Sequence, residues 1–481
     1  MQYSEHIVAG LCKPPFAEGL STKTNKITKL TPKQAEILLA ICEGEALCLN
    51  GLTSLDFETA KVLGGFKGYL LSLEGVTNLI AATAEALAEF KGALLYLSGL
   101  TTLDTAMALA KFKGETLHLT GLTGLAPEIA KALAGFEGER LMFSGLASLQ
   151  ADAAKSLAEF GGDALCLGGP LLLDAQAARS IAEFDGDELS LCDLVNLDAN
   201  TASALAEFKG TELALSNLPT LDAATAKALA KCGCKEISIH SLTATSGDEV
   251  EAIAGFKGEQ LSLHSLSVLD ADTARPLASF SGRRLNLFNT TTFDAAMALA
   301  QFKGEELFLG GLKWLDADNA KALAEFTGEK LRLPGLTKID AHAAGALAKF
   351  KGQTLCLEGL TWLAADSASA LAEFKGQHLL LSGLASLQAD TAKALAGFNG
   401  KALNLNGLSN LAADCAKNLA PFKGEHLFLC GLTAIDVDTA NALAEFEGKA
   451  LHAHSLAPID AAAEAALRRN RKIEQGVASV F

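Results

Sequence analysis

One pattern of apolar and polar positions repeats along almost the whole chain. Its clearest mark is F-x-G: 16 of the 24 phenylalanines recur every 24 residues, with two steps of 22 residues. Cys42 and Cys232 fill the two gaps in this column, which gives 18 units. The aligned units read L-x-L-x-G-L-x-x-L-D-A-x-T-A-x-A-L-A-x-F-x-G-x-x. A fixed period of this length indicates a repeat architecture. The column consists of Phe66, Phe90, Phe112, Phe136, Phe160, Phe184, Phe208, Phe256, Phe280, Phe302, Phe326, Phe350, Phe374, Phe398, Phe422 and Phe446.

Each unit predicts a strand, a turn and a short helix. The L-x-L triplet alternates as a strand does, with both leucines turned inward. In the alanine-rich stretch the apolar residues recur at three and four, which predicts a helix of about two to three turns. An aspartate before this stretch is expected to cap its free N–H groups. These aspartates are Asp56, Asp198, Asp222, Asp270, Asp316, Asp340 and Asp436.

The glycine that follows the phenylalanine is expected to end the helix. It stands at Gly68, Gly92, Gly210, Gly352 and Gly424 and at most equivalent positions. A left-handed residue just after a helix is usually glycine, because glycine has no Cβ to clash in that conformation.

A single unit cannot bury its own leucines, alanines and phenylalanine, so neighbouring units must stack. Parallel strands are roughly 4.8 Å apart, whereas packed helices need about 8–10 Å between their axes. The helical side must therefore be convex. The sequence predicts an α/β fold: a curved βα solenoid with a parallel inner sheet of about 18 strands and short alanine-rich helices on the convex side.

These units resemble leucine-rich repeats over about residues 27–460. Their L-x-L-x-x-L-x-x-L order is most similar to the bacterial L-x-x-I-x-L-P…A-F-x-x-C subclass, found in surface antigens. The units depart from that subclass in three ways: a later phenylalanine, a strand-end proline only at Pro334, and a length of 24 residues. The resemblance implies a protein-binding scaffold.

The two ends depart from the repeat and are expected to act as caps. Residues 1–26 lack the pattern and form the predicted N-terminal cap, and the solenoid is predicted over 27–460. Residues 461–481 form the predicted C-terminal cap and tail, with a last helix over 461–475 whose outer end is basic.

Charge and composition limit the classes of partner that the protein is expected to bind. The net charge of −16 disfavours nucleic acid and anionic membranes. The apolar runs are too short for a membrane span, and the N-terminus has no secretory pattern. Ten scattered cysteines suit reduced thiols, so a cytoplasmic location is expected, with non-standard export left open.

No motif of a hydrolase, zinc protease, P-loop or dinucleotide-binding enzyme occurs in the chain. We therefore expect a protein that is not an enzyme and that needs neither cofactor nor metal. In particular, the C-x-C spacing of Cys232 and Cys234 is not the usual zinc spacing.

The inner face is the first place to look for a binding site. In the middle column of the L-x-L triplets, Arg332 is the one charged residue. Either this face meets a partner, or it is neutral because like charges stacked across strands repel.

A first candidate patch comprises Arg332, Phe308, Trp314, Lys338 and Trp362. The two tryptophans occupy identical columns two units apart, with Lys338 between them. A lysine stem between two indoles would gain about 0.5–1 kcal/mol from cation–π contact. Tryptophan and arginine are frequent binding hot spots. The alternative is that this edge packs on itself.

A second candidate block runs from Glu188 to His264. Glu188, Glu212 and Glu236 share one column, and His240 and His264 share another. Stacked carboxylates repel one another, so a cation or basic partner could compensate them. We expect instead that the three side chains splay into water.

In the same block the glycine after the strand is replaced in five consecutive units. The replacing residues are Asp193, Asn217, Ser241, Ser265 and Asn289. Asp and Asn are expected to keep the left-handed backbone that glycine would adopt.

The sequence thus predicts a non-enzymatic scaffold that binds a protein on its inner sheet or on one edge. Two alternatives remain open: a structural or adhesin-like surface protein, and a solenoid that associates with itself and has no discrete ligand.

Overall fold

A computed structural model describes residues 24–42, 46–100, 102–194, 197–218, 221–240, 247–264, 270–288, 293–456 and 460–474. The chain divides into two compact units, Met1–Ser241 and Leu242–Phe481, and each is described by itself.

The first unit alternates strands and helices in chain order. Its strands are β1 (Ala46–Cys48), β2 (Leu70–Leu73), β3 (Leu94–Leu97), β4 (Thr116–Thr120), β5 (Arg140–Ser144), β6 (Ala164–Leu171), β7 (Glu188–Leu194), β8 (Glu212–Leu215) and β9 (Glu236–Ile239). Its helices are α3 (Pro32–Ile41), α4 (Phe57–Gly64), α5 (Ala81–Ala88), α6 (Leu103–Leu109), α7 (Pro127–Ala134), α8 (Ala151–Leu157), α9 (Ala175–Ile181), α10 (Ala199–Leu205) and α11 (Ala223–Leu229).

The second unit continues the same alternation. Its strands are β10 (Gln260–Leu263), β11 (Arg284–Leu287), β12 (Glu306–Leu309), β13 (Lys330–Arg332), β14 (Thr354–Cys356), β15 (His378–Leu380), β16 (Ala402–Asn404), β17 (His426–Phe428), β18 (Ala450–His452) and β19 (Ile473–Glu474). Its helices are α12 (Gly247–Ala254), α13 (Ala271–Ala278), α14 (Phe293–Leu299), α15 (Ala317–Ala324), α16 (Ala341–Leu347), α17 (Ala365–Ala372), α18 (Ala389–Leu395), α19 (Ala413–Leu419), α20 (Val437–Ala444) and α21 (Ala461–Leu467).

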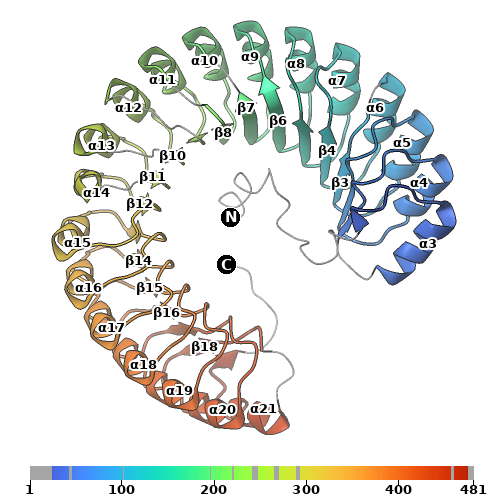
Figure 1. Ribbon diagram of the computed structural model, residues 1–481. Coiled ribbons are helices and arrows are strands. Elements are labelled where there is room, and N and C mark those ends of the chain that lie inside the picture. Colours follow the sequence, from blue (N-terminus) through green and yellow to red (C-terminus); the bar gives the residue numbers. More distant parts are fainter. Residues whose placement is uncertain are drawn as a thin grey trace. The chain divides into compact units, whose positions relative to one another are not determined.

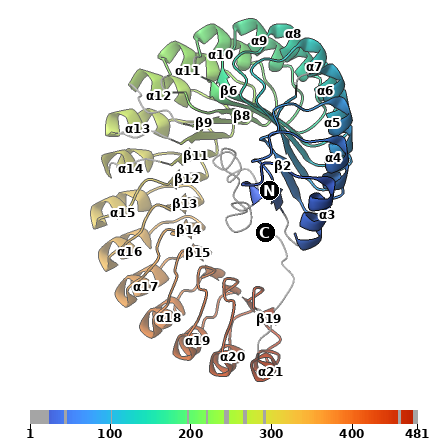
Figure 2. The ribbon, with the colours of Figure 1, turned by 45° about the vertical axis from the view of Figure 1, so that its right-hand side comes forward.

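Within each unit, the strands form one parallel layer and the helices form the other, on the convex side (Figure 1 and Figure 2). Equivalent repeat positions pair across the strands, as in Leu331 with Leu355 and Leu355 with Leu379. These leucines are fully buried between the layers. The predicted leucine-rich-repeat-type βα solenoid is confirmed.

The phenylalanine column forms a stacked spine in both units. From Phe66 to Phe208 successive ring centroids lie 6.0 to 6.5 Å apart, with planes within 7° of parallel. From Phe256 to Phe398 the spacing is 6.0 to 6.2 Å. Offset stacking at this spacing is favourable beyond the burial of the rings.

The expected role of the glycine after the phenylalanine is wrong. Helix α16 ends at Leu347, before Phe350, and Gly352 is not among the glycines with positive φ. Instead, a Cβ on Gly352 would lie 2.2 Å from Cζ of Phe350 and 2.6 Å from the carbonyl oxygen of Gly328. Glycine is needed here because the ring of its own repeat folds over it.

The predicted helix caps are confirmed. All seven aspartates are N-cap residues whose side chains accept a hydrogen bond from a backbone N–H inside the first turn. The left-handed backbone expected after the strand is also confirmed at Asp193, with φ of 65°, and at Asn217, with φ of 59°. Ser241, Ser265 and Asn289 lie outside the described residues.

The predicted last helix over 461–475 is too long. Helix α21 ends at Leu467, and Ile473 pairs with Leu451 to start a further strand, β19. Asn470 stands in the phenylalanine column and donates hydrogen bonds to the carbonyl oxygens of Ala444 and Phe446. A polar residue therefore ends the spine by capping carbonyl groups of the preceding repeat.

Candidate functional site

The inner sheet face is not equally open along the chain. In β7 and β8 of the first unit, the middle residues Ser190 and Ala214 are fully buried. The middle residues are half-buried in four strands of the second unit: Arg332 in β13, Leu380 in β15, Asn404 in β16 and Phe428 in β17. Within the second unit, a partner could therefore reach the inner face most readily at β13 and from β15 to β17, whereas Cys356 in the middle of β14 is fully buried.

Arg332 and Phe308 lie together at one end of this open stretch. Their strands pair in register, and the guanidinium carbon of Arg332 lies 5.0 Å from the Phe308 ring centroid. Two carboxylates hold the guanidinium, Glu306 at 3.7 Å and Glu358 at 3.4 Å. Phe308 also contacts Phe288, at 4.5 Å between ring centroids. Because two carboxylates hold Arg332, its guanidinium is fixed in position over the Phe308 ring.

Trp314, Lys338 and Trp362 lie in the loops that follow β12, β13 and β14. The two indoles are about half exposed, at 55% and 54%. The first two of these loops are tied together, because Thr337 N–H donates to the carbonyl oxygen of Lys313 at 3.0 Å. Lys338 is exposed, and the cation–π contact that the described structure shows in this patch is made by Arg332, not by Lys338.

The carboxylates of Glu188, Glu212 and Glu236 form a continuous row across β7, β8 and β9. The expectation that they splay into water is wrong, since Glu212 is only 9% exposed and the side chain of Glu188 only 14%. Arg140 reaches Glu188 at 3.6 Å across the small side chain of Ala164. This row therefore has a countercharge at its Glu188 end.

Burial and neighbouring charges change the protonation of the carboxyl groups in this row. Burial, together with the carboxylates of Glu236 and Glu188, raises the pKa of Glu212 to about 8. Burial also raises the pKa of Glu188, against the opposing effect of Arg140. At neutral pH Glu212 is thus a neutral acid between two other carboxyl groups.

His240 and His264 have different surroundings. His240 lies 3.2 Å from the hydroxyl of Ser238, and burial lowers its pKa to about 4. His264 stacks on Phe288, with ring centroids 3.8 Å apart. His264 therefore begins a row of rings that continues through Phe288 to Phe308 and ends at Arg332.

The sequence reasoning missed a histidine cluster near the end of the second unit. His426 and His452 share a hydrogen bond of 3.0 Å, and Phe428 stacks on His452 at 4.5 Å. His454 lies 5.6 Å from His452.

The positions of the histidines along the chain could have indicated this cluster. Seven of the nine histidines lie in strands or within two residues of their ends: His118, His240, His264, His378, His426, His452 and His454. Within the residues that the structure describes, no three metal-binding side chains are grouped to hold an ion. The cluster is therefore a polar aromatic surface.

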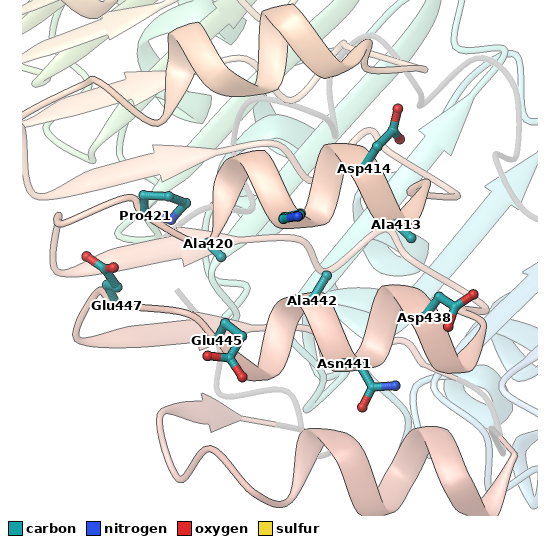
Figure 3. Close-up of a pocket in the computed structure, with 10 residues that line it drawn as sticks. Ala413, Asp414, Ala420, Pro421, Asp438, Asn441, Ala442, Glu445 and Glu447 are labelled. Atoms are coloured by element: carbon teal, nitrogen blue, oxygen red, sulfur yellow. The ribbon is translucent and has the colours of Figure 1, made fainter.

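A groove of about 630 Å³ lies on the helical side between α19 and α20 (Figure 3). Its middle is lined by Ala420 and Ala442, and Asp414 and Asp438 lie at one end. Small side chains here let the helices approach each other closely. The groove contains no aromatic anchor, so it is a weaker binding candidate than the inner face of the second unit.

Over the described part of the chain, no helix combines the length and apolarity that crossing a bilayer requires.

No family model matches the chain, and no curated protein matches it in sequence. Solved structures with a similar fold include TLR13 in its complex with ssRNA13, with 17% identity, 81% of this chain and 61% of that chain covered, and a TM-score of 0.39. A leucine-rich repeat protein of Leptospira interrogans has 16% identity, 74% and 93% coverage, and a TM-score of 0.37. A chain of the glycosylated Drosophila Toll–Spatzle complex has 13% identity, 75% and 50% coverage, and a TM-score of 0.43. This chain spans less than two thirds of the TLR13 and Toll–Spatzle chains.

Proposed function

We propose that this chain is a non-enzymatic scaffold that binds a protein partner through the second unit. The contact surface comprises the open inner strands β13, β15, β16 and β17 and the adjoining loops that carry Trp314, Lys338 and Trp362. The observation that carries the proposal is that both tryptophans of the chain are half exposed in equivalent loops of this one region. Tryptophan is enriched among the few residues that carry most of the binding energy at protein interfaces.

The chemistry of the surface supports a protein partner. Arg332 is held between Glu306 and Glu358 and covers Phe308, so it loses little conformational freedom on binding. Leu380 in β15 and Phe428 in β17 add apolar area on either side of Asn404 in β16. Acidic groups are interspersed with this surface, and the whole chain carries −16, which disfavours a phosphate backbone as partner.

The proposal predicts that removing the exposed rings weakens binding of the partner without unfolding the protein. In the double variant Trp314→Ala, Trp362→Ala we expect at least about tenfold weaker binding, since each anchor typically contributes about 1–2 kcal/mol or more. The partner is first captured by a photo-crosslinking residue placed at Lys338, and its affinity is then measured by calorimetry against wild type and variant.

The matched control is the double variant Met297→Ala, Leu172→Ala. These apolar side chains are 47% and 62% exposed but lie outside the proposed surface. We expect this variant to bind as wild type does. Equal affinity of the tryptophan variant and wild type, with both folded by circular dichroism, would contradict the proposal.

The finer assignments of the resemblance also belong here. Three further predictions from the sequence remain: membership of the bacterial surface-antigen subclass, cap boundaries at 1–26 and 461–481, and a cytoplasmic location.

Light scattering over a range of concentrations separates a scaffold for another protein from a solenoid that associates with itself, because only the mass of the latter changes with concentration.

A further inference from the structure

The last repeat of the first unit replaces the F-x-G turn by Cys232-Gly233-Cys234. Two features that most other repeats of this chain share change together here. One cysteine stands at the phenylalanine position, and a second stands at the glycine position. The preceding repeat shows why the two changes are coupled. There, a Cβ on Gly210 would lie 2.2 Å from Cζ of Phe208. The same Cβ would lie 2.4 Å from the carbonyl oxygen of Gly186. A side chain at the third position of the turn therefore requires that the ring at the first position is absent and that the backbone shifts.

The same geometry directs the two cysteine side chains toward each other. The Cβ of the third residue points at the space that the ring of the first residue fills in other repeats. In the C-G-C turn, Cys234 N–H lies 3.4 Å from the sulfur of Cys232, and the Cys232 thiol donates to the carbonyl oxygen of Phe208 at 3.6 Å. Both residues are buried, at 6% and 2% exposure.

These contacts also make the two thiols unequal. The adjacent side chain and N–H of Cys234 lower the pKa of Cys232, although burial acts in the opposite direction. The pKa of Cys234 is raised, first by the neighbouring Cys232 side chain and then by burial. Such a pair has an attacking sulfur and a neighbouring thiol that can resolve the first oxidation product.

We propose that Cys232 and Cys234 form a redox-active dithiol that a hydroperoxide oxidises to an intramolecular disulfide. The thiolate of Cys232 attacks the hydroperoxide, the O–O bond breaks, and the sulfur becomes a sulfenic acid while water or an alcohol leaves. The sulfur of Cys234 then displaces the hydroxyl group as water, and the S–S bond forms. In total the two thiols give up two protons and two electrons, which the hydroperoxide takes.

Other cysteines of the described chain lack this arrangement. Cys166 and Cys356 are buried singly in strands β6 and β14, and burial raises the pKa of each thiol. Cys415 donates to the carbonyl oxygen of Leu387, and its pKa is also raised. In the C-G-C turn, by contrast, the backbone N–H of one cysteine lies 3.4 Å from the sulfur of the other.

The test uses the full chain, oxidised in its folded state with hydrogen peroxide. After quenching, free thiols are blocked with N-ethylmaleimide in denaturant, and the protein is cut after glutamate. This releases the peptide 213–236, whose only cysteines are Cys232 and Cys234. We expect the oxidised peptide to lose two hydrogen atoms, about 2 Da, and to take up no maleimide. Treatment with dithiothreitol before blocking should restore two maleimides.

Two serine variants separate the proposed pair from general oxidation. Cys232→Ser and Cys234→Ser each remove one partner, so neither should show the loss of two hydrogen atoms. Two maleimides on the wild-type peptide after oxidation would overturn the proposal. So would added oxygen without loss of hydrogen, or a disulfide that forms only when peroxide is added in denaturant.

Discussion

Replacing Glu212 by glutamine is expected to stabilise the first unit at alkaline pH and to flatten its pH dependence. The pKa of Glu212 in the folded protein is raised to about 8 from an ordinary value of 4.5, because it is buried and lies between Glu188 and Glu236. The folded state therefore keeps a proton that the unfolded state has released. Its stabilising effect is complete below pH 4.5 and is lost as pH rises through about 8.

The effect of Glu212 is measured between pH 6.5 and pH 9 as the difference between wild type and variant. Below pH 6.5 the lowered pKa values of His118 and His240, both about 4, give stability the opposite slope. We expect the wild-type melting temperature to fall from pH 6.5 to pH 9, and that of Glu212→Gln to fall less, since the raised pKa values of Glu188, Cys166 and Cys234 remain in both proteins. Between pH 6.5 and pH 9 the wild type should lose about 2 kcal/mol of stability relative to the variant, or roughly 4–8 °C.

The control for this prediction is Glu159→Gln, which changes an exposed carboxylate of the same unit. It should melt as wild type does at every pH, as followed by scanning calorimetry. Parallel melting curves for wild type and Glu212→Gln between pH 6.5 and pH 9 would show that Glu212 is ionised throughout and that the carboxylate row is solvated.

The fold could be predicted from the repeat because each position of the repeat carries the same kind of side chain in nearly every unit. Leu331 and Leu355 pair in register, and Asp436 caps its helix, because both interactions are local or repeat from unit to unit. The role of Gly352 could not be read from the frame. It depends on how the Phe350 ring turns back over its own chain, which is a rotamer property that spacing does not show.

The candidate site was less predictable because burial on the inner face depends on neighbouring repeats. Glu212 looked like a solvated residue in sequence, but adjacent strands cover it. Arg140 reaches Glu188 only because Ala164 between them is small. The exposure of Trp314, by contrast, could be anticipated from its loop position, since it follows the strand and precedes the helix.

Cys232→Phe and Cys234→Gly together change the C-G-C turn back to the usual F-x-G turn. We expect their effects on the free energy of unfolding to be strongly coupled. Cys232→Phe alone should destabilise the first unit, since its ring tip would meet the Cβ of Cys234 at about the 2.2 Å seen between Phe208 and Gly210. Cys234→Gly alone should cost about 1 kcal/mol through lost packing and greater freedom of the unfolded chain. The double variant removes the clash and buries a ring, which is worth about 1.5–3 kcal/mol. It should therefore be at least as stable as wild type, with a coupling of about 2–3 kcal/mol.

The matched control is a double-mutant cycle with the reverse substitutions, made in a repeat that has the usual F-x-G turn. Phe350→Cys should destabilise the second unit by opening a cavity beside Phe326 and Phe374, its stacking neighbours at 6.0 and 6.1 Å. Gly352→Cys should destabilise it by the 2.2 Å clash with the Phe350 ring. The double variant should be less unstable than the sum of the two, because the ring that clashes is gone. Calorimetric unfolding of the four proteins in each cycle measures both couplings. Additive effects in both cycles would mean that the ring and the glycine do not constrain each other, and that the paired cysteines arose without steric cause.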